Sequence, residues 1–358
     1  MPFFSICIPN YNYEKYLGIT LDSVLGQQFG DLEILVADNA STDKSLEVVR
    51  AYQERDSRIK WRRNNINVGF AGNLGKSAEM ATGEWMTMLS SDDLLHSECL
   101  MIYKGFIEEL GEVAPYTILS SAQDVIDGDG KKFRYIGVDW KVWKGAERHA
   151  RLSEIAGADV WIMDANQLLR NSLQLIRTPF AFASTTYSRQ LYASVEGYSQ
   201  GGIINPDKKF AWAILAKAQK AIFVDKPLVS YRVHNQNQGS QQARSGALKF
   251  FVDEYVSTFQ IDNDVLAYAG ITREDFEKAF VEQDIALRGL AAMADGQRAF
   301  ARRVLDFGRA AYPQHCRKNK KVMILRSLLL AGPLGVMAAR RARERYQKTW
   351  EDRITKPT

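Results

Sequence analysis

The sequence predicts an α/β fold, with a mixed, mostly parallel sheet flanked by helices and a helical region at the C-terminus. Three observations support this prediction. Short apolar runs alternate with helical patterns through the first hundred residues, which is typical of a parallel sheet with covering helices. Beyond Asp93 the pattern becomes irregular and mixes helical with strand-like runs. From residue 244 onward the apolar spacing is helical.

The first hundred residues predict four strands with a helix between each pair. Residues 3–9 (FFSICIP), 32–38 (LEILVAD) and 59–63 (IKWRR) are the first three expected strands. The stretch EWMTMLSSDD at 84–93 contains the fourth, so Asp92 and Asp93 follow its C-terminal end. The first expected helix has the apolar face Leu17, Leu21, Val24 and Leu25, the second has Leu46, Val49 and Tyr52, and the third spans roughly 70–82. Ser41, Thr42 and Asp43 are all good N-cap residues for the second helix.

Later segments continue the alternation less regularly. Leu100, Tyr103, Phe106, Ile107 and Leu110 share one helical face, and the strand-like run YTILSSAQDVID is followed by a turn at GDGK. At 358 residues and 46% hydrophobic content, the chain is long enough for one large domain with an appendage. A net charge of +5 is too small to indicate nucleic acid as a partner.

Cysteine usage and the N-terminus predict a cytoplasmic protein. Cys7, Cys99 and Cys316 have neither metal-type spacing nor a disulfide pattern, which fits a reducing compartment. The N-terminal run is interrupted by Pro9 and Asn10 too early for a secretory signal. The most apolar segment, 322–339, is broken by Arg326, Gly332 and Pro333, which makes it a poor membrane span.

Two readings of Asp92 and Asp93 follow from the residues alone. Either carboxylate could cap the helix that comes next, because the first N–H groups of a helix need acceptors. Alternatively, carboxylate oxygens at a strand end suit Mg²⁺ or Mn²⁺, which takes few protein ligands and completes its shell with water and phosphate. The carboxyl edge of an open α/β sheet is where ligands bind, and Asp38 ends another strand on that edge.

The segments SICIPNYNYEKYLGITLDSVLGQQFGDLEILVADNASTDKS and NVGFAGNLGKSAEMATGEWMTMLSSDD decide between these readings. In order and spacing they resemble the nucleotide-sugar domain of inverting family-2 glycosyltransferases, which have the GT-A fold. The resemblance runs to about residue 95 and resumes over 179–240. It implies a domain at 1–240, with a nucleotide-sugar half (1–95) and an acceptor half (96–240), followed by a helical region with a basic amphipathic tail (241–358).

The resemblance implies a set of binding residues on this chain. Its D-x-D element corresponds to Ser90, Ser91 and Asp92, with Asp93 after it, so Asp92 takes the metal role and Asp93 a catalytic position near the sugar or metal-bound water. Ser90 departs from the family's aspartate. The other residues that it implies for nucleotide-sugar binding are Pro9, Tyr11, Glu14, Asp38, Asn39, Asn67, Gly69, Asn73, Ser91 and Arg232.

Two further motifs complete the implied site. An inverting reaction needs a base for the acceptor hydroxyl, and the family's acidic pair corresponds to NPDK, which makes Asp207 the base, with Pro206 in place of its acidic neighbour. Asp207 could also be a helix cap. The element YRVH resembles the family's segment that closes over the diphosphate, where His234 completes the metal shell. Trp140, Trp143, Trp161, Phe180 and Phe182 are each assigned to the core, although one of them is expected to contact the acceptor.

The predicted function is an inverting glycosyltransferase of the hexosyltransferase type, acting in surface polysaccharide or glycoconjugate synthesis. Its donor would be a UDP, dTDP or GDP sugar, its cofactor Mg²⁺ or Mn²⁺, and its acceptor a glycan or lipid-linked glycan. One alternative is a catalytically inactive carbohydrate-binding or scaffold relative, which Ser90 and Pro206 keep open. Another is a nucleotidyltransferase, but that class predicts a Gly-rich phosphate loop near the N-terminus, and the segment PNYNYEKY is not such a loop.

The C-terminal sequence predicts one more contact. A leucine-rich stretch is followed by Arg340, Arg341, Arg343, Arg345 and Lys348, which together suit the anionic inner face of the cytoplasmic membrane. The alternative is a terminal helix that packs its leucines on the enzyme or on another subunit of a homo-oligomer.

Overall fold

The computed structural model describes residues 1–198, 206–234, 251–252, 255–256 and 258–354. It divides into two compact units. Unit 1 comprises Met1–Ser172, Arg177–Gln241 and Phe259–Ala269, and unit 2 comprises Leu173–Ile176, Gln242–Thr258 and Gly270–Thr358. Each unit is described by itself.

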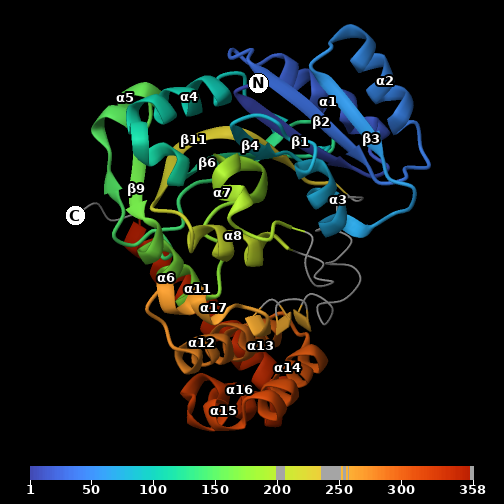
Figure 1. The fold of residues 1–358 in the computed structure, drawn as a ribbon. Coiled ribbons are helices and arrows are strands. Elements are labelled where there is room, and N and C mark those ends of the chain that lie inside the picture. Colours follow the sequence, from blue (N-terminus) through green and yellow to red (C-terminus); the bar gives the residue numbers. More distant parts are fainter. Residues whose placement is uncertain (199–205, 235–250, 253–254, 257, 355–358) are drawn as a thin grey trace. The chain divides into compact units, whose positions relative to one another are not determined.

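Unit 1 is built on an 11-stranded mixed sheet in the order β3-β2-β1-β4-β10-β6-β11-β9-β8, with β5 paired to β11 and β7 to β6 (Figure 1). The predicted α/β class is confirmed, because β3, β2, β1 and β4 are parallel, as are β6 and β11. β10 is antiparallel to both β4 and β6, and so joins the two parallel sets. The strands are β1 (Phe4–Asn10), β2 (Leu32–Asp38), β3 (Ile59–Arg63), β4 (Trp85–Met88), β5 (Leu94–Leu95), β6 (Thr117–Ile126), β7 (Lys132–Ile136), β8 (Glu147–Arg148), β9 (Val160–Asp164), β10 (Thr186–Ser188) and β11 (Lys220–Arg232).

Helices lie on both faces of this sheet. α1 and α2 lie together on one face of the parallel strands, and α3 lies on the other (Figure 1). The helices of unit 1 are α1 (Glu14–Leu25), α2 (Ser45–Arg55), α3 (Gly69–Ala78), α4 (Cys99–Leu110), α5 (Ala150–Ala156), α6 (Ala165–Leu175, whose last turn belongs to unit 2), α7 (Arg189–Ala193), α8 (Asp207–Leu215) and α11 (Asn263–Tyr268), with 3₁₀ turns at Gly111–Tyr116 and Phe182–Ser184.

The core of unit 1 forms where the expected strands meet the expected helix faces. Every residue of β1 and β2 is buried, as predicted for parallel strands covered on both sides. Leu17, Leu21 and Val24 of α1 pack against these strands, each with no exposed surface. All three cysteines are buried and free, in agreement with the expected absence of a disulfide.

One local prediction is confirmed in part, and another differs from the structure. The N-cap residue of α2 is Lys44, but Asp43 Oδ1 accepts from the N–H of Ser45, the first residue of this helix, at 3.0 Å. Asp43 Oδ2 also accepts from the N–H of Glu14, which ties the β2–α2 loop to the start of α1. The third helix ends at Ala78 rather than near 82, because the N–H and hydroxyl of Thr82 both donate to a buried carboxylate.

That carboxylate belongs to Glu33, the second residue of the apolar strand β2, with a side chain that is only 4% exposed. Its Oε1 accepts from Ser5 Oγ at 2.8 Å and from the N–H and hydroxyl of Thr82, both at 2.7 Å. Oε2 accepts from Lys60 Nζ at 2.9 Å. Gly83 is needed here, because a Cβ would lie 2.8 Å from Ser5 Oγ and 3.0 Å from the Phe4 carbonyl carbon. One carboxylate thus fastens β1, β2, β3 and the turn before β4.

Unit 2 is helical in its described residues, as predicted from residue 244. It contains α12 (Arg273–Phe280), a π-helical turn (Val281–Leu287), α13 (Arg288–Ala294), α14 (Arg298–Ala311), α15 (Pro313–Lys318), α16 (Lys320–Leu330) and α17 (Pro333–Ile354). A Cβ at Gly308 would lie 2.7 Å from Ile285, so a glycine is required for α14 to approach the π-helical turn this closely. Among the described residues, no helix is both long and apolar enough to cross a membrane.

We expect Glu33→Gln to destabilise unit 1 by on the order of 3 kcal/mol at pH 7. Burial raises the pKa of the Glu33 carboxyl, but the hydrogen bonds from Lys60, Thr82 and Ser5 outweigh it and lower the pKa to about 2. The stabilisation is therefore complete above the ordinary glutamate pKa and is lost as the pH falls towards 2. Urea unfolding between pH 7 and pH 3 measures this loss, and the exposed Glu54→Gln is the control. A gap between wild type and Glu33→Gln that stays constant with pH would contradict the assignment.

Candidate active site

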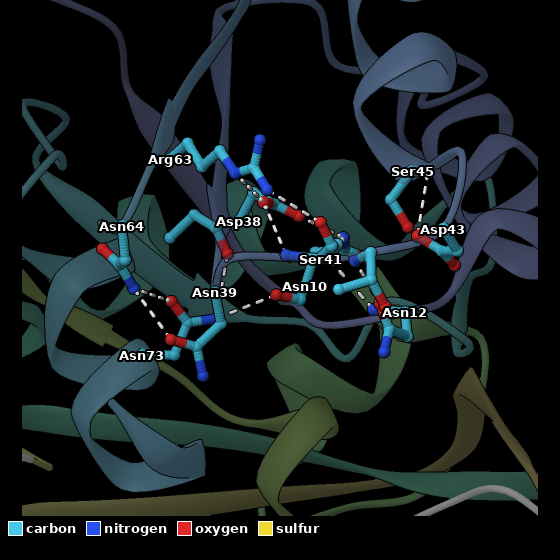
Figure 2. Close-up of polar contacts among 12 residues, drawn as sticks. Asn10, Asn12, Asp38, Asn39, Ser41, Asp43, Ser45, Arg63, Asn64 and Asn73 are labelled. Carbon is cyan, nitrogen blue, oxygen red and sulfur yellow. Dashed lines mark hydrogen bonds and ion pairs between the residues drawn. The ribbon is translucent and has the colours of Figure 1, made fainter. Parts of the chain in front are cut away.

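The carboxyl ends of β1, β2 and β4 meet at one edge of the sheet and bring the predicted polar residues together (Figure 2). Asp38 ends β2, and its carboxylate is 1% exposed. Asp38 Oδ1 accepts from Asn10 Nδ2 at 3.0 Å, and Oδ2 accepts from the N–H of Ser41 at 3.1 Å. Arg63, at the end of β3, places Nε 3.6 Å from Oδ2. Asp38 is thus held in place from both neighbouring strands.

Asn39 connects this aspartate to the start of α3. Its Nδ2 donates to Asn67 Oδ1 at 2.8 Å and to the carbonyl of Gly69 at 3.2 Å. Its Oδ1 accepts from the N–H of Val68 at 2.9 Å. Gly69 has a φ of 78°, a conformation that a side chain disfavours, which explains a glycine at this position. The predicted residues Asn39, Asn67 and Gly69 therefore form one connected loop.

Asn73 is buried beneath this loop. Its Nδ2 donates to the carbonyls of Asn10 at 3.2 Å and Ala37 at 2.9 Å, and its Oδ1 accepts from Asn64 Nδ2 at 2.9 Å (Figure 2). These bonds use side-chain amides to satisfy carbonyl groups at the ends of β1 and β2. Asn73 consequently holds the ends of β1 and β2 in position.

The predicted residues at the end of β1, in the loop after it and at the start of α1 differ in burial and in contacts. Pro9 is buried, and its carbonyl accepts from Ser91 Oγ at 2.7 Å, which joins the ends of β1 and β4. Tyr11 is 42% exposed. Glu14 Oε2 accepts from the N–H of Lys44 at 2.6 Å, so this carboxylate holds two loops together.

Asp92 and Asp93 lie in the turn between β4 and β5, and neither caps α4, whose N-cap residue is Glu98. The helix-cap reading is therefore wrong. Asp93 Oδ1 accepts from the backbone N–H of Arg232 at 2.9 Å, and Arg232 Nε donates to the carbonyl of Asp92 at 2.8 Å. Thr20 Oγ1 lies 2.9 Å from the carbonyls of both Ser91 and Asp93. The turn is thus held between α1 and the end of β11.

His234 lies directly against Asp92. Its Nε2 is 2.9 Å from Asp92 Oδ2, and both side chains are 7% exposed. The ring of Tyr16 packs against His234 at 4.6 Å and also lies 5.0 Å from the Arg232 guanidinium. Within the described part of the chain, no group of three or more His, Cys, Asp or Glu side chains is arranged to hold a metal by itself.

Arg232 is 2% exposed, and its Nη1 donates to the carbonyl of Asp127 at 3.1 Å. In this conformation the guanidinium positions the Asp92 turn and the β6–β7 turn relative to each other.

The electrostatics of the site follow from two neighbouring buried carboxylates. Burial, reinforced by the negative charge of Asp92, holds the pKa of Asp93 well above its usual range, although the Arg232 N–H and the Ser90 hydroxyl oppose the shift. Burial also raises the pKa of Tyr13, and both aspartates raise it further. The Tyr13 hydroxyl therefore stays protonated at neutral pH and can donate a hydrogen bond to an anionic ligand.

Asp207 is the first residue of α8, and Pro206 occupies the N-cap position, so the helix-cap reading of Asp207 is wrong. Asp207 and the other two carboxylates of the site all affect the pKa of Tyr231. Burial raises the pKa of the Tyr231 hydroxyl, and the charges of Asp93, Asp92 and Asp207 raise it further. Tyr231 is thus close enough to interact electrostatically with the Asp92–Asp93 turn and with Asp207.

Several residues of this arrangement were not predicted from the sequence. Thr20, Tyr16 and Asn10 all contact predicted residues. Asn10 ends β1, and Tyr16 and Thr20 lie in α1, so their only signal was closeness in the sequence to the loop that follows β1. Among the aromatic residues assigned to the core, Trp143 and Phe180 are buried. The core assignment of Trp140 is wrong, because it is 52% exposed and lies edge-on to Trp161 at 4.7 Å.

Comparisons with known proteins agree with this geometry. The family model described as Glycosyl transferase family 2 matches residues 5–118. Abequosyltransferase RfbV of Salmonella typhimurium is 34% identical over 112 residues, which are 30% of this chain and 34% of that protein. The GalNAc(5)-diNAcBac-PP-undecaprenol beta-1,3-glucosyltransferase of Campylobacter jejuni is 39% identical over 101 residues, 28% of this chain and 33% of that protein. The matches to these two relatives therefore span about a third of their length.

One solved structure matches nearly the whole chain. Residues 1–349 of TarS from S. aureus, in complex with UDP-GlcNAc, superpose with a TM-score of 0.59 at 19% identity. The match covers 97% of this chain and 92% of that one. This likeness shows a shared GT-A fold that includes the C-terminal helical region.

We expect Asp93→Asn to raise the melting temperature by about 2 °C or more at pH 7 in the presence of a chelator. Because the pKa of Asp93 is raised in the folded state, its ionisation opposes folding at neutral pH. Asparagine keeps an acceptor for the Arg232 N–H and carries no charge. The gain should shrink as the pH falls towards the ordinary aspartate pKa, where wild type is protonated as well. Exposed Asp31→Asn is the control, and a lower melting temperature for Asp93→Asn would contradict the argument.

Proposed function

We propose that the chain, whose residues 5–118 match the model of glycosyl transferase family 2, is an inverting glycosyltransferase whose donor is a nucleoside diphosphate sugar. The observation that carries the proposal is the Asp92–His234 pair at the carboxyl edge of the sheet, next to the Asp38 and Asn39 loops. We propose residues 1–240 as the transferase domain, with residues 1–95 as its nucleotide-sugar half and 96–240 as its acceptor half.

The nucleoside would occupy the edge formed by Asp38, Asn39 and the exposed ring of Tyr11. Asp38 keeps acceptor capacity for a base or ribose N–H or O–H, because each carboxylate oxygen has two lone pairs. The ring of Tyr11 can pack on a base. UDP, dTDP and GDP sugars are all candidates, since these contacts do not select one base.

Asp92 and His234 are the residues that would hold a divalent ion, Mg²⁺ or Mn²⁺. Their facing atoms are 2.9 Å apart, close to the roughly 3.0 Å between adjacent ligands of an octahedral ion with bonds of about 2.1 Å. The donor set, one carboxylate and one imidazole, suits Mn²⁺, and the remaining ligands would be water and diphosphate oxygens. A bound ion would neutralise charge that develops on the leaving diphosphate.

Asp207 is the base in this proposal. Inversion requires the acceptor hydroxyl to lose its proton while it attacks the anomeric carbon from the face opposite the diphosphate. Asp207 lies on α8, and both Asp207 and Asp93 are within electrostatic range of Tyr231. Its carboxylate would take the proton of the acceptor hydroxyl on that face. Arg232 would act on the donor through the position of the Asp92 turn, because its guanidinium donates to two backbone carbonyls.

The acceptor we propose is a glycan or a polyprenol-linked glycan in surface polysaccharide or glycoconjugate synthesis. The support is the Campylobacter relative, whose name includes GalNAc(5)-diNAcBac-PP-undecaprenol. A protein that acts on such an acceptor would meet it at the inner face of the cytoplasmic membrane.

The experiment is a panel of UDP, dTDP and GDP sugars, incubated with the full chain and Mn²⁺ or Mg²⁺, with release of nucleoside diphosphate as the readout. We expect one donor to be hydrolysed slowly and the release to stop with EDTA. Asp207→Asn should lower this release about 100-fold or more while the affinity for the nucleoside diphosphate is unchanged, because an amide cannot accept the proton.

The matched control is Asp264→Asn, an exposed carboxylate in the first turn of α11. If Asp207→Asn releases nucleoside diphosphate at the wild-type rate, another group is the base. If a nucleoside diphosphate binds but no donor is hydrolysed, the chain is the inactive carbohydrate-binding relative that Ser90 and Pro206 suggest.

A further inference from the structure

Five large apolar side chains of unit 2 are exposed on α16 and α17. Their exposed fractions are 49% for Met323, 52% for Ile324, 74% for Leu330, 72% for Leu334 and 51% for Met337. Single exposed apolar side chains are normal, but five within 15 residues are a concentration that usually marks a contact surface. These five residues are named the α16–α17 surface below.

The two helices are nevertheless firmly packed on their other sides. Val322, Leu325 and Leu329 of α16 are buried. A Cβ on Gly289 would lie 2.3 Å from Leu325, so α13 and α16 are in close contact. A Cβ on Gly335 would lie 1.9 Å from the carbonyl oxygen of Leu328, so only glycine lets α17 approach α16 this closely. The α16–α17 surface is therefore the outward side of a helix pair with a fixed geometry.

The exposed residues follow helical spacing. Met323 and Leu330 are seven residues apart on α16, and Leu334 and Met337 are three apart on α17. Arg341 continues the second stripe four residues beyond Met337. Each helix thus presents an apolar stripe that ends next to basic residues, which is the pattern of helices that lie in a membrane interface.

The charged residues of the segment that contains this surface have one sign. Residues 313–343 contain eight Lys and Arg and no Asp or Glu. Lys321 and Arg343 pair with Glu282 and Asp295 of unit 2. Six other basic residues are exposed and form no ion pair within the described chain, namely Arg317, Lys318, Lys320, Arg326, Arg340 and Arg341. A partner for this surface must therefore be apolar and negatively charged.

We propose that the α16–α17 surface docks the protein on an anionic lipid surface. Apolar side chains of this length can enter the acyl boundary, while the surrounding cations meet lipid phosphates, each contributing about fivefold to the partition constant. A protein partner would have to match unpaired cations on two helices with its own acidic groups, whereas an anionic membrane supplies negative charge everywhere. The inference deepens the proposed function and rests on it in one respect, the lipid-linked acceptor.

Vesicle sedimentation tests this with the full chain and two vesicle types, phosphatidylcholine alone and its equal mixture with phosphatidylglycerol. We expect binding to the mixed vesicles at low salt, release at high salt, and no binding to phosphatidylcholine. The double variants Leu330→Gln with Leu334→Gln, and Arg326→Gln with Arg341→Gln, should each weaken binding about tenfold or more. Point variants are needed because truncation before Val322 would remove the buried Leu325 and Leu329.

The matched control is Ile19→Gln with Met101→Gln, two exposed apolar residues of unit 1, which should bind like wild type. No binding to the mixed vesicles, or binding that neither double variant weakens, would overturn the inference. So would a dimer in sedimentation velocity that Leu330→Gln with Leu334→Gln converts to a monomer without any vesicle binding. Donor hydrolysis without vesicles is a separate readout, so failure of the proposed function leaves this test unaffected.

Discussion

The contact between the Asp92–Asp93 turn and the end of β11 is the constraint on which the rest of the site depends. Asp93 accepts the N–H of Arg232, Arg232 donates back to the carbonyl of Asp92, and His234 lies 2.9 Å from the Asp92 carboxylate. The residues joined lie about 140 positions apart in the sequence. Two carboxyl groups are buried side by side here, and ionising both has a cost in stability, which raises the pKa of Asp93. Such a cost is typical of functional sites, where charge is arranged for a ligand.

A second buried carboxylate, near the amino ends of the same strands, stabilises the fold and so offsets this cost. Glu33 is also a buried carboxylate, but it accepts hydrogen bonds from Ser5, Thr82 and Lys60, so its ionised form stabilises the fold. The same sheet therefore carries a satisfied carboxylate near the amino ends of its strands and a strained pair at its carboxyl edge. The unfavourable electrostatics are thus confined to the edge where a bound cation would relieve them.

Local sequence patterns were sufficient for the parallel strands and for the residues that end them. Asp38, Asn39 and Asp92 lie at one edge, as expected from strands whose carboxyl ends coincide. Long-range partners could not be predicted, because the contacts of Thr20 with Ser91 and of Arg232 with Asp127 join residues 71 and 105 positions apart. Glu33 gave no signal for a buried charge, since its strand reads as a continuous apolar run. The cap assignments of Asp93 and Asp207 failed because Asp93 accepts from the N–H of Arg232 and Asp207 lies one residue past the N-cap position.

The central claim is that Asp92 and His234 supply the protein ligands of a metal site that a nucleoside diphosphate completes. Calorimetric titration of Mn²⁺ into the chain, with and without saturating nucleoside diphosphate, tests it most directly. The account predicts one ion per chain when the nucleotide is present, much weaker binding without it, and a loss of affinity of about tenfold or more in His234→Ala. Mn²⁺ affinity that is the same in His234→Ala as in wild type would contradict the claim.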